Sequence, residues 1–169
     1  DAGCSGAWDA RIGTEKMRLM WIQLALGLFQ ADLAVKQEID NNADFDSEQS
    51  LLGGKVRIKK LRNYGMAGGR LKEHMPVIIK VSGLLTLGCV GLFLRTLWKQ
   101  GHVLSKAGYA LLSGGAISNL YDRCKNGYVV DYISFQTPWR YLNRLVFNLS
   151  DFFIAAGAIL ICLGQTDND

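Results

Sequence analysis

Four long stretches of mostly apolar residues dominate the pattern along this chain. They cover residues 17–35, 75–98, 103–121 and 145–164. A helix needs about 20 apolar residues to cross the hydrocarbon core of a bilayer, and each stretch comes close to that length. The pattern therefore predicts an all-α integral membrane protein in which four transmembrane helices form one domain over residues 16–164. Little apolar sequence remains outside the helices to build a soluble core.

Two shorter stretches between the helices have the pattern of β-strands. Residues 55–61 alternate apolar and basic side chains, and residues 128–133, which follow an Asn-Gly turn, are mostly β-branched or aromatic. The first of these stretches belongs to a charged insert, residues 37–73, between the first two helices. We expect it either to complete a small β-sheet or to rest its basic face on anionic lipid headgroups.

Both ends of the chain are polar. Residues 1–15 contain glycines and several charged side chains, and residues 165–169 are polar throughout. Such composition predicts a flexible N-terminal tail, or a remnant of the cloned sequence, and a short C-terminal tail.

Composition and charge exclude several classes of protein. The net charge is +4, but the basic residues are spread along the chain rather than gathered in a stripe, so we expect no nucleic-acid partner. The four cysteines have no paired spacing, and the two histidines, His74 and His102, lie far apart. We therefore expect no disulfide framework, no metal site and no cofactor.

Two carboxylates lie inside the apolar stretches. Asp32 is in the first, four residues before Lys36, and Asp151 is in the fourth. Their side chains are too short to reach far towards water, and an unpaired charge inside a membrane is costly. Such residues indicate a functional site, although a structural ion pair between Asp32 and Lys36 at helix spacing is the alternative.

A denser polar cluster lies around the end of the third helix. Asn119, Asp122 and Arg123 fall within one helical turn, with Asn119 and Asp122 on one face. Asp131 then interrupts the second predicted strand between apolar neighbours. An ionisable group in that position indicates either a catalytic carboxylate or a salt bridge from Asp131 to Arg123 that pins a loop.

The fourth helix brings another carboxylate to the same side of the membrane. Asn148 and Asp151, three residues apart at its start, share a face. One turn-rich loop joins the third and fourth helices, so Asp131 and Asp151 can face each other. Repulsion between them raises one pKa and depresses the other, which leaves one proton shared by the pair. An aspartic peptidase uses this state: the ionised carboxylate deprotonates a water, and the protonated one polarises the scissile carbonyl.

Five short motifs follow one another along the chain. They are Asp32 with Lys36, Asn-Tyr-Gly-Met-Ala at 63–67, Asn-Leu-Tyr-Asp-Arg at 119–123, Gly-Tyr-Val-Val-Asp at 127–131 and Phe-Asn-Leu-Ser-Asp at 147–151. In content and order they resemble the motifs of lipoprotein signal peptidase, also called signal peptidase II. Each motif is short, but five in the family's order make the resemblance specific.

The resemblance implies a membrane aspartic endopeptidase that removes the signal peptide of bacterial prolipoproteins just before their lipid-modified cysteine. By position, Asp131 and Asp151 match the catalytic pair. The residues that match the surrounding polar site, which holds the pair and the substrate backbone, are Asp32, Lys36, Asn63, Asn119, Asp122, Arg123 and Asn148.

The resemblance also implies where such a protein works and what it binds. It places four helices in the bacterial cytoplasmic, or inner, membrane, with both termini in the cytoplasm and a small extracytoplasmic β-sheet beside the active site. The implied partners are diacylglyceryl-modified prolipoproteins, membrane lipids and inhibitors of the globomycin type. The implied molecule is a monomer that needs no cofactor.

Three departures from the family pattern and two alternative functions accompany this interpretation. Ser150 stands where the family usually has Ala and is small enough to hydrogen-bond a carboxylate. Two glycines at 68–69 replace a usual Phe, which affects substrate preference, and the loop over residues 40–60 is unusually charged. One alternative is a transporter component with a proton or ion relay through Asp32, Lys36 and Asp151. It predicts polar residues through the depth of several helices, whereas here they gather at one side. The other is a catalytically degenerate homologue that acts as a membrane scaffold.

Overall fold

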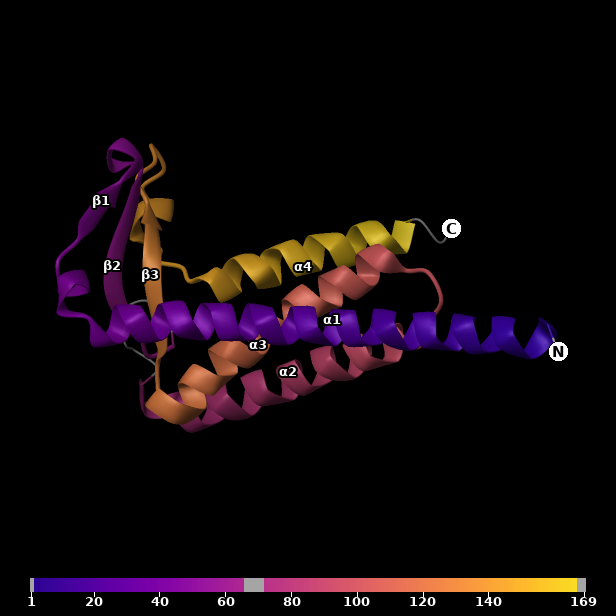
Figure 1. Ribbon diagram of the computed structural model, residues 1–169. Coiled ribbons are helices and arrows are strands. Elements are labelled where there is room, and N and C mark those ends of the chain that lie inside the picture. The colour runs from indigo at the N-terminus through magenta and orange to yellow at the C-terminus, as the bar shows by residue number, and fades with distance from the viewer. Residues whose placement is uncertain (1, 66–71, 167–169) are drawn as a thin grey trace.

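The computed structural model describes residues 2–65 and 72–166. Most of that part of the chain is helical, and a small β-sheet lies across one end of the helices (Figure 1). The helices are α1 (Ala2–Asn41), α2 (Met75–Leu97), α3 (Val103–Asn126) and α4 (Leu149–Thr166). The predicted combination of a helical bundle with a small sheet is confirmed.

Helix α3 lies at the centre of the bundle and packs against α1, α2 and α4. Small side chains let neighbouring helix backbones approach closely, and polar side chains in such a position find partners in protein rather than in lipid. The central position therefore explains how α3 is accommodated although it is less apolar than its neighbours. Its buried residues are small or polar: Ser105, Gly108, Ala110, Ser113, Gly114, Gly115, Ser118, Asn119 and Asp122.

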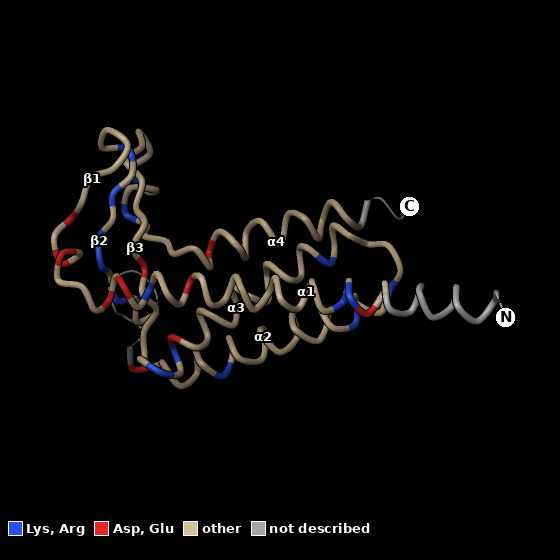
Figure 2. The backbone as a smooth tube through the Cα atoms, viewed as in Figure 1, with Lys and Arg blue, Asp and Glu red and all other residues tan. Residues whose placement is uncertain are grey.

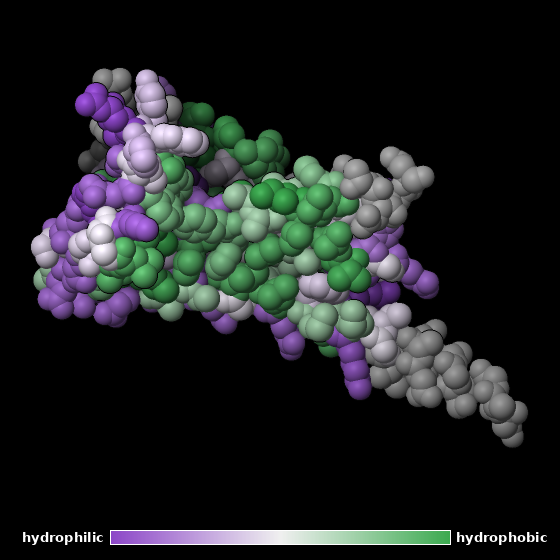
Figure 3. Space-filling view, turned by 90° about the horizontal axis from the view of Figure 1, so that it is seen from above, coloured by the Kyte–Doolittle hydropathy of each residue, from purple (hydrophilic) through white to green (hydrophobic). Residues whose placement is uncertain are grey.

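Within the described residues, two helices are long and apolar enough to cross a bilayer by length and composition, α1 over Gly13–Asn41 and α2 over Met75–Leu97. Helix α4 is apolar but shorter, over Leu149–Gly164. Charged residues lie mainly towards the two ends of the bundle and in the sheet (Figure 2). Leu84 and Leu87 of α2 are 72% and 71% exposed, and Figure 3 shows apolar side chains gathered over the middle of the helical part. Lipid contact accounts for such exposed apolar side chains.

The ends of α1 differ from the prediction. Residues 2–15 continue the helix instead of forming a separate tail, and α1 extends beyond the expected end at residue 35 to Asn41. Once an apolar span has nucleated a helix, each flanking residue adds a hydrogen bond at little cost, so polar flanks remain helical. At the other end of the chain, residues 165–166 complete α4, and residues 167–169 lie outside the described residues.

Three antiparallel strands form the sheet in the order β1-β2-β3. They are β1 (Gln49–Leu51), β2 (Val56–Asn63) and β3 (Val129–Phe135). Both predicted strands are confirmed as β2 and β3, whereas β1 is too short for an alternating pattern to predict it. In the register of β2 and β3, Asn63 lies opposite Val129, two residues before Asp131.

Strand β3 connects the sheet to the bundle. Gly127 ends α3 in a left-handed conformation (φ 74°), which turns the chain directly into β3. Further along, Ile133 and Phe147 exchange backbone hydrogen bonds of 2.7 and 2.8 Å just before α4 begins. Val130 of β3 packs against Ile39 near the end of α1. The ends of α1 and α3 and the start of α4 therefore meet at this strand.

Candidate active site

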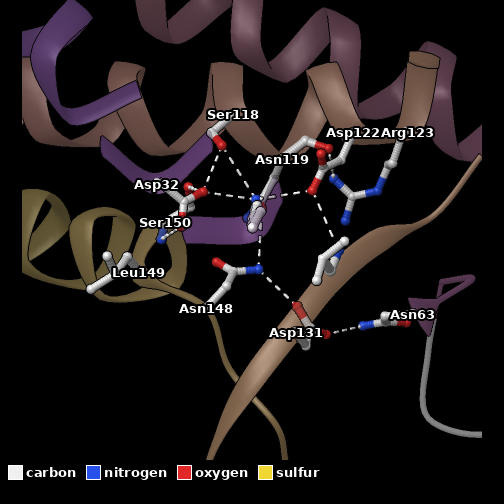
Figure 4. A network of polar contacts seen from close by, with 12 residues as sticks. Asp32, Asn63, Ser118, Asn119, Asp122, Arg123, Asp131, Asn148, Leu149 and Ser150 are labelled. Carbon is white, nitrogen blue, oxygen red and sulfur yellow. Dashed lines mark hydrogen bonds and ion pairs between the residues drawn. The ribbon is translucent and has the colours of Figure 1, made fainter. Parts of the chain in front are cut away.

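Asp131 lies on β3 with its carboxylate buried between two amide side chains (Figure 4). Asn63 Nδ2 donates a hydrogen bond to Oδ2 at 2.8 Å, and Asn148 Nδ2 donates to Oδ1 at 2.7 Å. The sheet positions Asn63, because this residue ends β2 opposite the start of β3. Among the described residues Asp131 has no ion pair with Arg123, so the salt bridge considered as an alternative is not formed.

Asn148 holds Asp151 at the first turn of α4. The Asn148 backbone N–H donates to Asp151 Oδ2 at 3.1 Å, and the Asp151 backbone N–H donates to Asn148 Oδ1 at 3.0 Å. This reciprocal pattern is a capping box, which requires the three-residue spacing found here. The other carboxylate oxygen, Oδ1, accepts a hydrogen bond from Asn119 Nδ2 at 3.2 Å. Asn148 therefore contacts both carboxylates, Asp131 through its side chain and Asp151 through the helix cap.

Asp131 and Asp151 line the same cavity, which has a volume of about 380 Å³. A peptide substrate needs polar partners for its backbone and apolar surface for its side chains. The cavity offers both kinds of surface. Its other polar lining residues are Asn63, Asn119, Arg123 and Asn148, and its apolar lining residues are Val129, Leu145, Val146 and Phe147.

Burial raises the pKa of Asp131 to about 6. The hydrogen bonds from Asn63 and Asn148 lower the pKa because they stabilise the ionised form, whereas the nearby charge of Asp151 raises it. Burial is the largest of these influences. Asp131 therefore exchanges a proton close to neutral pH, which is the property that acid–base chemistry requires of a carboxyl group.

A second, fully buried cluster adjoins the cavity and is centred on Lys36 of α1. The ammonium Nζ pairs with Asp32 Oδ2 at 2.8 Å and with Asp122 Oδ2 at 3.2 Å. It also donates to Asn119 Oδ1 at 2.8 Å, and the same oxygen accepts a hydrogen bond from Asn148 Nδ2 at 3.2 Å. Two carboxylates compensate the cost of burying the ammonium. Lys36 thus orients Asn119, which donates to Asp151, and through the Asn119 oxygen it also orients Asn148, which donates to Asp131.

Asp32 joins three helices through its carboxylate. Ser118 Oγ of α3 donates to it at 2.6 Å, and Ser150 of α4 donates through both its hydroxyl and its backbone N–H, the latter at 3.2 Å. The Ser at position 150 therefore does hydrogen-bond a carboxylate, and that carboxylate is Asp32. Ser118 is not among the predicted site residues. Its position four residues before Asp122 is the signal that places it on the same helix face as Asp122.

Asp122 and Arg123 complete the set of predicted residues. Asp122 Oδ2 accepts a hydrogen bond from the Val130 backbone N–H at 3.3 Å, which links α3 to β3. Arg123 lines the cavity, and its Nη1 donates to the Asn119 carbonyl oxygen one turn earlier at 3.1 Å. The structure thus brings all nine predicted residues into one connected region, while the glycines at 68–69 lie outside the described residues.

The arrangement supports acid–base hydrolysis. One carboxyl is buried with a raised pKa, the other caps a helix at the same cavity, and neutral amides hold both in place. Such a pair can activate a water molecule and protonate a leaving group. Within residues 2–65 and 72–166, no group of three or more His, Cys, Asp or Glu side chains is arranged to hold a metal ion.

Comparison with known proteins adds an independent line of evidence. A family model described as signal peptidase (SPase) II matches residues 24–166. A lipoprotein signal peptidase from Mesorhizobium japonicum is 32% identical over 143 residues, which cover 84% of this chain and 82% of that protein. Another from Clostridioides difficile is 30% identical over 146 residues, which cover 86% of this chain and 93% of that protein.

Two solved structures share the fold. Both are described as bacterial membrane enzyme structures obtained by the in meso method, and each superimposes with a TM-score of 0.73. They are 22% and 23% identical, cover 88% and 86% of this chain, and are themselves covered over 88% and 92% of their lengths. The region matched by the family model contains every residue of the site described above. The chain belongs to the signal peptidase II family.

Proposed function

We propose that this protein is an aspartic endopeptidase that cleaves the signal peptide of bacterial prolipoproteins before their lipid-modified cysteine, with Asp131 and Asp151 as the catalytic pair. The observation that carries the proposal is the single cavity lined by both carboxylates, one buried between two amides and the other at the cap of α4. The family and the names of the relatives supply the substrate class.

In the proposed reaction the two carboxyl groups share one proton. We assign that proton to Asp131, whose pKa is raised to about 6 by burial, and the role of general base to Asp151. Asp151 takes a proton from water, and the water oxygen attacks the scissile carbonyl carbon while Asp131 donates a hydrogen bond to the carbonyl oxygen. The carbon–nitrogen bond of the tetrahedral intermediate then breaks, and Asp151 passes the proton it gained to the leaving nitrogen.

The surrounding polar residues position the two carboxylates and the substrate backbone relative to each other. Asn119 and Asn148 hold the two carboxylates, and the ammonium of Lys36 holds Asn119. Arg123 lies on the cavity wall, where its guanidinium is positioned to bind carbonyl oxygens of the substrate backbone. Asn63 Nδ2 donates to Asp131 from the sheet, and the side-chain oxygen Oδ1 of Asn63 accepts a hydrogen bond from the Gly65 backbone N–H at 3.0 Å.

We further propose that all four helices cross a bacterial inner membrane, with the sheet and the cavity on the extracytoplasmic side and both termini in the cytoplasm. The apolar spans of α1 and α2 support two crossings, and the packing of α3 against α1, α2 and α4 supports the same depth for the others.

Phe147 on the cavity wall suits the acyl chains of a diacylglyceryl-modified cysteine. All site residues come from one chain, so a monomer is sufficient. Membrane lipids surround it, and globomycin-type peptides compete for the cavity.

The test is cleavage of a lipidated prolipoprotein by the purified protein in detergent. Asp131→Asn and Asp151→Asn keep the shape of each side chain but remove its acid–base function, so each is expected to slow cleavage by roughly 10²- to 10⁴-fold. Asp44→Asn is the matched control, because Asp44 is an exposed acid outside the cavity and is expected to leave the rate unchanged. Globomycin added to the wild type is expected to block the reaction.

Two outcomes would contradict the proposal. Cleavage that survives either Asn substitution would mean that the wrong carboxylate has been assigned. No cleavage by a wild type that is folded, as judged by its circular dichroism and unfolding temperature, would argue against peptidase activity altogether.

A further inference from the structure

A second cavity lies at the opposite end of the bundle from the catalytic pair. It has a volume of about 590 Å³ and is formed by α1, the connection between α2 and α3, and the first turn of α3. In Figure 1 this connection lies beside the part of α1 that leads to the N-terminus, far from the sheet. We refer to it as the distal cavity. The proposed peptidase reaction does not use it.

The lining of the distal cavity carries positive charge without acidic side chains. Its charged members are Arg18, Lys99 and Lys106. Within the described part of the chain, none of the three forms an ion pair with a carboxylate. Arg18 is held in place, because its Nε donates to the Leu97 carbonyl oxygen at 3.3 Å and its guanidinium lies 4.0 Å from the centre of the Trp98 ring. A fixed guanidinium beside two ammonium groups favours an anionic ligand.

Aromatic and apolar side chains line the same cavity. Trp21 is 9% exposed, and its indole N–H has no hydrogen-bond acceptor among the described residues. Trp98 is 71% exposed, and Met17 and Val103 are 47% and 56% exposed. Trp residues next to basic side chains at the end of an apolar bundle are typical of the layer where lipid headgroups lie. The ligand that matches this lining is therefore amphipathic as well as anionic.

We propose that the distal cavity binds the headgroup of an anionic phospholipid. Arg18, Lys99 and Lys106 contact the phosphate, and the acyl chains lie against Met17 and Val103. A zwitterionic lipid brings its own cation into a cavity that already holds three, so an anionic lipid binds more tightly. A free phosphate ion satisfies the cations but leaves the exposed apolar surface uncovered, which favours the lipid. This site does not depend on the peptidase reaction.

Native mass spectrometry of the full-length protein in detergent tests the proposal, with phosphatidylglycerol and phosphatidylcholine of identical acyl chains as probes. The variant K99Q/K106Q removes two cations of the cavity and keeps Arg18, whose contacts with Leu97 and Trp98 brace two helices. The matched control K16Q/K80Q removes the same charge from exposed positions that do not line the cavity. Unfolding temperatures verify that both variants are folded.

We expect the wild type to bind phosphatidylglycerol on the order of tenfold more tightly than phosphatidylcholine. This preference should disappear in K99Q/K106Q and persist in K16Q/K80Q. Equal binding of both lipids by the wild type, or equal loss of preference in both variants, would overturn the proposal. In a further arm, millimolar inorganic phosphate is compared with sodium chloride of matched ionic strength. Lipid that stays bound in the presence of phosphate supports a headgroup site. Lipid that is displaced by phosphate but not by sodium chloride would identify the free ion as the ligand and overturn the lipid assignment.

Discussion

The environment of Asp131 shows how single residues set the chemistry of this site. Burial on β3 raises its pKa to about 6, although two amide donors oppose the change by stabilising the ionised form. An amide positions a carboxyl without adding a charge, so the group can still take up a proton, whereas a Lys or Arg partner would keep it ionised. The buried cation of the region, Lys36, is instead paired with Asp32 and Asp122.

This raised pKa predicts how stability depends on pH. Asp131 titrates near its ordinary value of about 3.9 when unfolded and at about 6 when folded, so between these values the folded state binds more protons than the unfolded state. The contribution of Asp131 to the free energy of unfolding is therefore highest when the pH lies below the pKa of the unfolded state, and it is lost as the pH rises through the folded pKa of about 6. The total loss is on the order of 3 kcal/mol. Asp131→Asn removes this dependence.

Unfolding temperatures of the wild type and Asp131→Asn, measured in detergent between about pH 4 and pH 7, check the prediction. The variant should gain stability relative to the wild type as the pH rises. Glu73→Gln is the control, since Glu73 is an exposed carboxylate outside the site, and its difference from the wild type should not change with pH. Parallel curves for the wild type and Asp131→Asn would contradict the assignment of a raised pKa.

At the residue scale, the sequence predicts contacts within a helical turn better than contacts between elements. The three-residue spacing of Asn148 and Asp151 predicts that they share a face, and the capping box between them confirms it. The hydrogen bond from Asn63 to Asp131 joins residues 68 positions apart, and only a family resemblance indicates it. Ser118 escapes prediction because a Ser among small residues in a helix indicates close packing as readily as hydrogen bonding.

At the scale of elements, glycines set the contact between α3 and α4. A methyl group added at Gly157 would lie 2.6 Å from the Gly108 carbonyl oxygen and 2.8 Å from the Leu112 backbone nitrogen. A Cβ added at Gly115 would lie 2.7 Å from the carbonyl oxygen of Ser150, the residue before Asp151. The position of the first turn of α4, and of the carboxylate it carries, therefore depends on glycines that leave no room for a side chain of their own at this interface.

Gly157→Ala is accordingly expected to destabilise the protein by about 1–3 kcal/mol, because backbone atoms of α3 and α4 must move apart to admit the methyl group. Gly88→Ala is the matched control on α2, where nothing lies within 4 Å of the added Cβ. Ala in place of an exposed helical Gly is expected to stabilise by up to about 1 kcal/mol. Unfolding in increasing denaturing detergent measures both variants. Equal effects of the two substitutions would show that the α3–α4 interface is not closely packed.

Elements are predictable where their pattern is long or regular. Apolar length predicts a helix over residues 75–98, and α2 covers Met75–Leu97. Alternation predicts a strand over residues 55–61, and β2 covers Val56–Asn63. Strand β1 is too short to show such a pattern. Its three residues form a strand because they pair with β2. The N-terminal part of α1 is likewise polar, and helix cooperativity rather than hydropathy extends it.

At the scale of the whole molecule, two chemically different ends are separated by an apolar middle. The sheet and the cavity lined by Asp131 and Asp151 lie at one end, and the α2–α3 connection with the distal cavity lies at the other (Figures 1 and 2). Between them, apolar side chains cover the surface seen in Figure 3. The polar residues in the middle of α3, such as Ser113, Ser118 and Asn119, are buried among its neighbours, so they do not interrupt this surface. A central helix can therefore lie at membrane depth without the composition of a lipid-exposed span.

This arrangement predicts that the two ends face opposite sides of the membrane, which single cysteines can test. In a background with the four native cysteines replaced by Ser, Ser47→Cys places a thiol near the sheet and Gln100→Cys places one in the α2–α3 connection, both at exposed positions. A membrane-impermeant maleimide added to intact cells with a permeabilised outer membrane should label position 47. Position 100 should react only after the inner membrane is opened, because the proposed orientation places it on the cytoplasmic side. Labelling of position 100 but not position 47 in intact cells would invert the proposed orientation, and labelling of both would mean that the bundle does not separate two compartments.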